Sequence, residues 1–150
     1  APAGKLAAEI FAWLESQPVM EPEATIEALD RAIRGSRGCV ASVAVIDAAA
    51  RRLRYGGIGN ITARLIGPGA EQFVNRDGVV GYRIVHPRQI ERMLMPGATL
   101  LMHTDGISSR AVADRVREFE GASASTIAER MLSRCAKPTD DAGVLVAGIR

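Results

Sequence analysis

Hydrophobic residues recur along this chain with two different spacings, and the first is helical. In residues 3–17 they return every three or four positions, and Pro18 ends the pattern. The apolar face predicted for this helix consists of Leu6, Ile10, Trp13 and Leu14. A second helix is predicted from Pro22 to Gly35, because proline suits a first helical turn and glycine stops a helix. Its predicted inward face consists of Ile26, Leu29 and Ile33.

From residue 40 the spacing shortens to brief runs rich in β-branched residues, separated by turn-forming residues. The predicted strands are residues 40–46, 52–55, 61–66, 72–75, 82–85 and 98–102. The helical period returns in residues 111–119 and in a helix that we predict to open at Thr126, in a capping box. A last strand follows over residues 144–149. Because strands and helices are grouped separately, the order favours an α+β fold with an antiparallel sheet and helices layered outside it.

Composition narrows the class of protein. The 150 residues suffice for one domain, residues 1–150, with its own core. A net charge of +2 with mixed signs and six aromatic residues argues against nucleic acid as a partner. The longest apolar stretch, near residues 39–46, falls short of the ~20 residues that cross a bilayer. With no export leader in view, we expect a cytoplasmic protein whose Cys39 and Cys135 are buried free thiols.

Two acidic motifs at the ends of apolar runs carry the strongest chemical signal. Asp105-Gly106 follows the run at residues 98–102, and Asp140-Asp141 precedes the run at residues 144–149. If these runs pair as antiparallel strands, the end of one lies beside the start of the other, and Asp105 and Asp140 converge. Converging carboxylates repel unless a proton or cation lies between them, and hard divalent cations prefer oxygen ligands. The pattern therefore favours a metal-assisted hydrolase.

Other motifs are better explained by structure. The Gly57–Ala63 segment matches the G-x-G-x-x-A form of a dinucleotide-binding turn, but a β-rich run follows it where that motif needs a helix, so we predict a strand-to-strand turn. His103 lies two residues before Asp105, yet with two His and two Cys in the chain a zinc site is disfavoured. No Ser-His-Asp triad is evident, and Ser108-Ser109 reads as a helix N-cap.

Taken together, the segments resemble the metal-dependent serine/threonine protein phosphatases of the PPM family, in the bacterial branch of SpoIIE and RsbX-like regulators. Three framework stretches are similar, residues 43–47, 53–60 and 96–102. The Thr104–Arg110 segment resembles the family's S/T-D-G motif, and the Asp140–Val146 segment resembles its closing D-D-A-T-V-L-V strand. The resemblance implies an αββα sandwich of mostly antiparallel sheets flanked by helices. It implies Mn²⁺ or Mg²⁺, with two ions in a complete site. The expected catalytic residues are the metal aspartates Asp105 and Asp140; Asp141 is the less favoured ligand, and Gly106 belongs to the metal site by allowing the turn that presents Asp105.

The resemblance also implies a substrate, a phosphorylated STAS-domain anti-anti-sigma factor or stressosome protein in a sigma-factor partner-switching pathway. Two departures from the family pattern bear on this expectation. The family's bridging aspartate and its N-terminal strands would fall before residue 1, and Gly143 stands where the closing motif has Thr. A catalytically inactive PPM-like binding module of the same pathway is therefore the alternative, and a hydrolase of small phosphorylated molecules is a third hypothesis.

Overall fold

The computed structural model describes residues 3–84 and 86–150, which form two compact units. The first unit comprises the residues up to Ile46, Leu53–Gly59 and Asn75–Glu91, and the second comprises Asp47–Arg52, Asn60–Val74 and Arg92–Arg150. Each unit has its own hydrophobic cluster.

Two amphipathic helices open the first unit, as the 3.6-residue period predicts. They are α1 (Ala3–Ser16) and α2 (Pro22–Ala32), the latter with its proline in the first turn. Their apolar faces meet a cluster of buried residues made of Ile26, Leu29, Ile58 and Val80. Ile10, Trp13 and Ile33 pack against this cluster, which confirms the predicted inward faces.

Most of a three-stranded sheet lies in the first unit, with the order β1-β2-β7. The strands are β1 (Ala41–Asp47), β2 (Arg52–Ile58) and β7 (Ile90–Met93), and a small antiparallel pair joins β5 (Gly78–Val79) to β6 (Arg83–Ile84). β2 continues through Gly56 and Gly57 to Ile58, beyond the predicted end of this strand at residue 55. β5 and β7 were not predicted, and Val85, expected to end a strand, lies outside the described residues.

A network of buried hydrogen bonds holds the C-terminal part of β2 in place. The hydroxyl oxygen of Tyr55, a residue only 1% exposed, lies 2.6 Å from Asn75 Oδ1 and 2.9 Å from Ser42 Oγ. Asn75 Nδ2 in turn donates to the Gly59 carbonyl at 3.1 Å. The network thus ties the end of β2 to the segment that carries Asn75.

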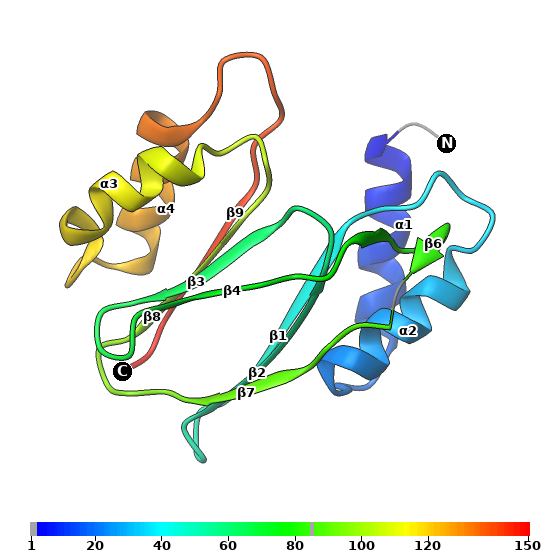
Figure 1. Cartoon of the computed structure of the whole chain (residues 1–150), viewed down its shortest axis with the longest axis horizontal. Coiled ribbons are helices and arrows are strands. Elements are labelled where there is room, and N and C mark those ends of the chain that lie inside the picture. The colour runs from blue at the N-terminus through cyan, green and yellow to red at the C-terminus, as the bar shows by residue number, and fades with distance from the viewer. Residues whose placement is uncertain (1–2, 85) are drawn as a thin grey trace. The chain divides into compact units, whose positions relative to one another are not determined.

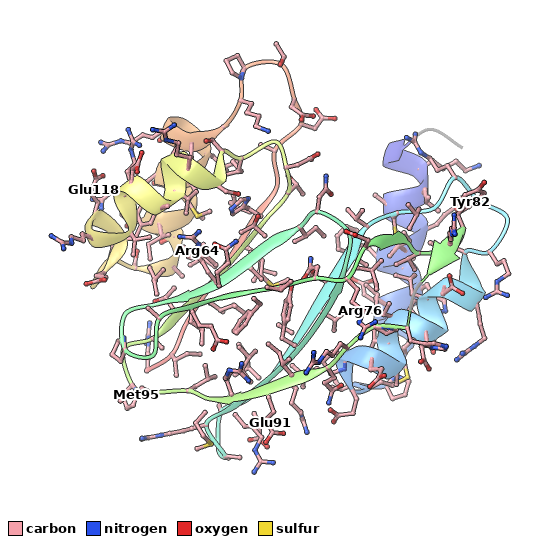
Figure 2. The ribbon with its side chains drawn as sticks, in the orientation of Figure 1. Arg64, Arg76, Tyr82, Glu91, Met95 and Glu118 are labelled. Atoms are coloured by element: carbon pink, nitrogen blue, oxygen red, sulfur yellow. The ribbon has the colours of Figure 1, made fainter. Side chains whose placement is uncertain are left out.

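We expect Tyr55→Phe to lower the free energy of unfolding by about 1–3 kcal/mol, because it leaves buried partners without their hydrogen bond. Urea denaturation measures this loss. Tyr82→Phe is the matched control because Tyr82, labelled in Figure 2, is an exposed tyrosine with 81% of its surface accessible. An unchanged midpoint in Tyr55→Phe would show that the hydroxyl contributes nothing.

The second unit is built on a four-stranded antiparallel sheet with the order β4-β3-β8-β9 (Figure 1). Its strands are β3 (Thr62–Ile66), β4 (Glu71–Phe73), β8 (Thr99–His103) and β9 (Val144–Gly148). The G-x-G-x-x-A segment leads from β2 into β3 and not into a helix, so the strand-to-strand turn is confirmed. β8 and β9 pair from Thr99↔Gly148 to His103↔Val144, which confirms the predicted antiparallel pairing.

Two helices, α3 (Ser109–Phe119) and α4 (Ala124–Cys135), pack together beside β9 (Figure 1). Ser108 caps α3 as predicted, and its Oγ accepts from the Ala111 N–H. The predicted start of α4 at Thr126 is wrong: Ser123 is the N-cap and accepts from the Thr126 N–H. The buried cluster between these helices and the sheet consists of Ile66, Leu101, Ile107, Val112, Phe119, Ile127, Met131 and Cys135.

The described residues thus form a mixed α+β fold with antiparallel sheets and four helices, in the predicted class. In the described part of the chain the order is two helices, eight strands, two helices and one strand. Among the described residues no helix is long and apolar enough to span a bilayer.

Candidate functional site

The two acidic motifs lie on loops that contact each other in the second unit. Asp105 follows β8 in the β8–α3 loop (residues 104–108), and Asp140 and Asp141 precede β9 in the α4–β9 loop (residues 136–143). All three aspartates are exposed. Because His103 is the last residue of β8 and pairs with Val144, the first residue of β9, the loops leave the same end of the sheet.

A reciprocal pair of hydrogen bonds joins the two loops directly beyond the strands. The Thr104 N–H donates to the Gly143 carbonyl at 3.0 Å, and the Gly143 N–H donates to Thr104 Oγ1 at 2.9 Å. A third bond runs from the Lys137 N–H to the Gly106 carbonyl at 2.8 Å. Asp105 and the Asp140-Asp141 pair are therefore carried on a single cross-linked structure.

At Gly106 the two loops lie close together. A Cβ atom built at Gly106 would overlap the backbone carbonyl of Asp141 and lie 3.1 Å from the Ala142 Cα. Only a residue without a side chain fits this position, because the obstructing atoms belong to the backbone and cannot rotate away. Glycine is therefore needed here for the contact with the other loop, and the backbone at Gly106 is not left-handed, so the turn itself does not explain it.

Asn60 contacts Asp105 and was not singled out from the sequence. Its Nδ2 donates to Asp105 Oδ2 at 2.8 Å. The register explains the contact: Thr62 pairs with His103, so residues two positions before and after this pair extend past the same end of the sheet. The sequence shows a Gly59-Asn60 turn, but only the β3–β8 pairing reveals that Asn60 contacts Asp105.

His103 is buried, whereas the three aspartates are exposed. It is 2% exposed, and its Nδ1 lies 2.9 Å from the Thr104 carbonyl oxygen, so Nδ1 carries the proton and donates. Nε2 is buried and has no hydrogen-bond partner among the described residues. Burial lowers the pKa of His103, the Thr104 hydrogen bond opposes this, and the charge of Arg64 adds to the lowering. Burial therefore favours the neutral form of this imidazole.

We expect the stability of the fold to depend on pH through His103. Since the folded pKa lies below the ordinary value of 6.5, the unfolded chain binds more protons, and the free energy of unfolding falls as pH drops below about 6.5. Denaturation at several pH values measures the slope between pH 5 and 7. His103→Leu should flatten it, whereas His86→Gln, which removes the exposed second histidine, should not. Equal slopes in all three proteins would contradict the assignment.

Gly143, which stands where the family motif has Thr, has room for a side chain. A Cβ atom there would lie 3.4 Å from Thr104 Cγ2, an ordinary contact distance, and the backbone is outside the left-handed region. We expect Gly143→Ala to raise the free energy of unfolding by about 0.4–1 kcal/mol, since it restricts the unfolded chain. Urea denaturation tests this, and a clear loss of stability would show that glycine is required at this position.

The donor chemistry of these loops suits a hard divalent cation, but the described residues do not make a complete site alone. Exposed carboxylates are the oxygen ligands that Mg²⁺ and Mn²⁺ prefer, and among the described residues no hydrogen bond occupies Asp105 Oδ1. Within the described part of the chain, however, no three His, Cys, Asp or Glu side chains gather closely enough to hold a metal ion. The same finding gives no support to a zinc site around His103.

Comparison with solved structures places the fold among phosphatases. RsbX in complex with magnesium matches with a TM-score of 0.79 at 21% identity, covering 93% of this chain and 70% of that one. The PP2C domain of SiaA from Pseudomonas aeruginosa matches with a TM-score of 0.74 at 21% identity, covering 95% and 67%. The serine/threonine phosphatase PstP of Mycobacterium tuberculosis matches with a TM-score of 0.70 at 18% identity, covering 97% and 80%. These structural similarities show that this chain has the same fold as the three proteins.

Sequence comparison shows the family. No curated protein sequence matches the chain significantly. The model of the family described as Stage II sporulation protein E (SpoIIE) matches residues 3–150, nearly the whole chain. The chain therefore belongs to the SpoIIE family, and its fold is that of the PPM-type phosphatases.

Proposed function

We propose that this chain is the phosphatase domain of a regulator that dephosphorylates phosphoserine or phosphothreonine on a partner protein. The observation that carries the proposal is the cross-linked pair of acidic loops, in which Thr104 and Gly143 bind reciprocally and Gly106 contacts the backbone of Asp141. Membership of the SpoIIE family supports the reaction class. The magnesium complex of RsbX and the complex of PstP with two manganese ions support the cation.

In this proposal Asp105 and Asp140 hold Mn²⁺ or Mg²⁺, with Asp141 as a neighbouring carboxylate. When bound, the cation supplies Lewis-acid chemistry that offsets negative charge on the phosphoryl oxygens and lowers the pKa of water. The chain's own residues keep the carboxylates in place: Asn60 binds one oxygen of Asp105, and Thr104 and Gly106 fix the distance between the loops. Ligands beyond these are needed, because the described acids do not form a group of three.

The substrate in this proposal is a phosphorylated protein of the STAS-domain or stressosome type. A solved structure from work on the bacterial stressosome, a system adapted to control secondary messenger signalling, matches with a TM-score of 0.85 at 25% identity and supports this assignment. The test is a panel of phosphoserine and phosphothreonine peptides and STAS-domain phosphoproteins set against small phosphorylated metabolites. Preferential release of phosphate from the proteins is expected, and preferential hydrolysis of the metabolites would favour a small-molecule hydrolase instead.

The alternative function is a PPM-like module that binds a regulator of the same pathway without hydrolysing it. The absence of a three-ligand group among the described residues favours it. Manganese separates the two hypotheses, because a binding module has no need of the ion. Partner binding that is unchanged by EDTA, together with no phosphate release at any Mn²⁺ concentration, would select the binding module.

A further inference from the structure

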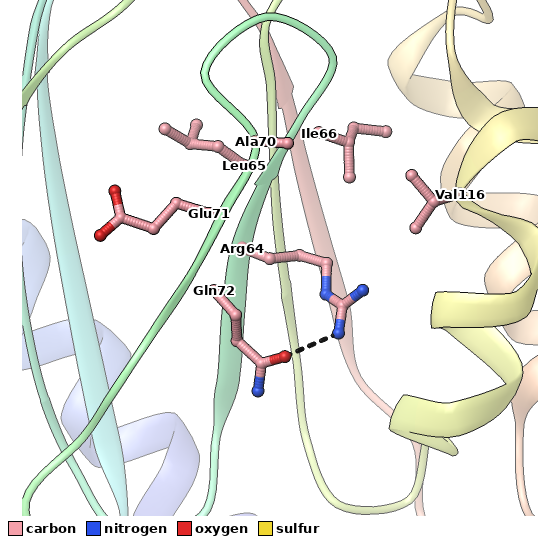
Figure 3. Close-up of a pocket in the computed structure, with 7 residues that line it drawn as sticks. All are labelled: Arg64, Leu65, Ile66, Ala70, Glu71, Gln72 and Val116. Atoms are coloured by element: carbon pink, nitrogen blue, oxygen red, sulfur yellow. Dashed lines mark hydrogen bonds between the residues drawn. The ribbon is translucent and has the colours of Figure 1, made fainter.

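A pocket lies in the second unit, where the edge of the sheet meets α3 (Figure 3). It has a volume of about 240 Å³ and is lined by Arg64, Leu65, Ile66, Ala70, Glu71, Gln72 and Val116. Arg64 and Gln72 face each other across the β3–β4 pair, so they project to the same side of the sheet. Figure 3 shows Arg64, Ile66 and Val116 on this side and Leu65 and Glu71 on the other.

Arg64 brings a positive charge into this pocket without a carboxylate to neutralise it. Among the described residues its hydrogen bond runs from Nη2 to Gln72 Oε1 at 2.8 Å, and it makes no ion pair. Its Nε is buried and has no acceptor. Burial lowers the pKa of the guanidinium, which reflects the loss of water around the cation. Such a group is stabilised by an anion that replaces the lost water.

The carboxylate that lines the pocket does not supply that anion. Glu71 points away from Arg64 and is bound by Arg92 through two contacts of 2.7 Å, Nε to Oε2 and Nη2 to Oε1. This ion pair lowers the pKa of Glu71, mainly through the hydrogen bonds from Arg92. The Glu71 carboxylate is therefore paired with Arg92 and does not neutralise Arg64. The side of the pocket facing α3 therefore keeps a net positive charge.

The remaining polar groups on that side are hydrogen-bond donors. Since a guanidinium cannot accept, Gln72 must present Oε1 to Arg64, which leaves the Gln72 Nε2 amide free to donate. The other walls on that side, Ile66, Ala70 and Val116, are apolar. A ligand that fits must combine acceptor oxygens with a small apolar body.

We propose that this pocket binds the carboxylate of a short aliphatic acid. The guanidinium of Arg64 and the side-chain amide of Gln72 donate hydrogen bonds to the carboxylate oxygens, and the alkyl chain packs against Val116. A planar guanidinium matches a carboxylate with two parallel hydrogen bonds. A single cation beside apolar walls suits a monoanion with an alkyl tail better than a doubly charged phosphate. The site is independent of Asp105 and of the phosphatase activity.

The test is a titration of the native gene product with sodium butyrate, followed by the methyl NMR signals of Val116 and Ile66 at constant ionic strength. We expect saturable shifts of both signals. Butyramide, which has the same shape without the charge, should give no saturable shift. Shifts that rise linearly with butyrate concentration, or that saturate equally with butyramide, would overturn the proposal. This test uses the native protein alone and needs no substitution.

Substitution of Arg64 tests whether this residue binds the carboxylate. Arg64→Gln should weaken butyrate binding by roughly tenfold or more, as expected for loss of a charge-assisted bidentate contact. Arg110→Gln, which removes an exposed arginine of α3, is the matched control and should bind as the native protein does. Native-like binding by Arg64→Gln would place the carboxylate elsewhere and contradict the assignment.

Discussion

Asp105→Asn should reduce manganese-dependent kcat/KM by roughly 10²- to 10³-fold, the scale of losing one charge-stabilising group at a phosphoryl-transfer site. The substitution removes the negative charge that we propose binds the cation, while its amide oxygen still accepts from Asn60 Nδ2. Because Asp105 is exposed, the free energy of unfolding should change by less than about 0.5 kcal/mol. Steady-state kinetics and urea denaturation on the same preparation separate these two effects.

Asp114→Asn is the matched control for this prediction. Asp114 is exposed on α3 in the same unit, so the variant makes the same change of charge away from the acidic loops. It should keep native kinetics. If both variants lose activity equally, net charge and not the Asp105 carboxylate accounts for the loss.

Gly106→Ala should cause the largest loss of stability among the glycine substitutions at the site. Its Cβ would overlap the Asp141 carbonyl, so one loop must move, at a cost of about 1–3 kcal/mol for forced overpacking. In a chain of this length that corresponds to a fall in Tm of roughly 2–12 °C. Activity should fall in addition, since the displacement separates Asp105 from the Asp140-Asp141 pair.

Gly148→Ala is the control for the steric argument. Gly148 ends β9, and nothing lies within 4 Å of a Cβ built there, so its Tm and activity should stay close to native values. Differential scanning calorimetry of both variants measures the contrast. A Gly106→Ala protein with a native Tm would show that the loops adjust without strain, and the proposed role of Gly106 would fail.

Local patterns were enough to predict the long elements and the pairing that positions the acidic loops. The helical period and Pro22 identified α1 and α2, because each helix buries one continuous apolar face. The apolar runs before Asp105 and after Asp141 gave β8 and β9 and their antiparallel pairing. These predictions succeeded because the information lies within a few neighbouring residues.

Elements that depend on distant partners were missed or misplaced. β5 has two residues, and β7, Ile90–Met93, is mostly exposed, so neither carries a period that sequence can reveal. The start of α4 was misplaced because Ser123 and Thr126 are both good N-caps, and the helix begins at the earlier one. Asn60 was missed because its contact with Asp105 depends on the Thr62↔His103 register.

The measurement that tests the central claim most directly is the Mn²⁺ dependence of p-nitrophenyl phosphate hydrolysis by the native gene product. We expect hydrolysis that rises to saturation with Mn²⁺, disappears with EDTA and is lost in Asp105→Asn. Hydrolysis that does not depend on Mn²⁺, or that Asp105→Asn leaves unchanged, would contradict a metal phosphatase site at the acidic loops.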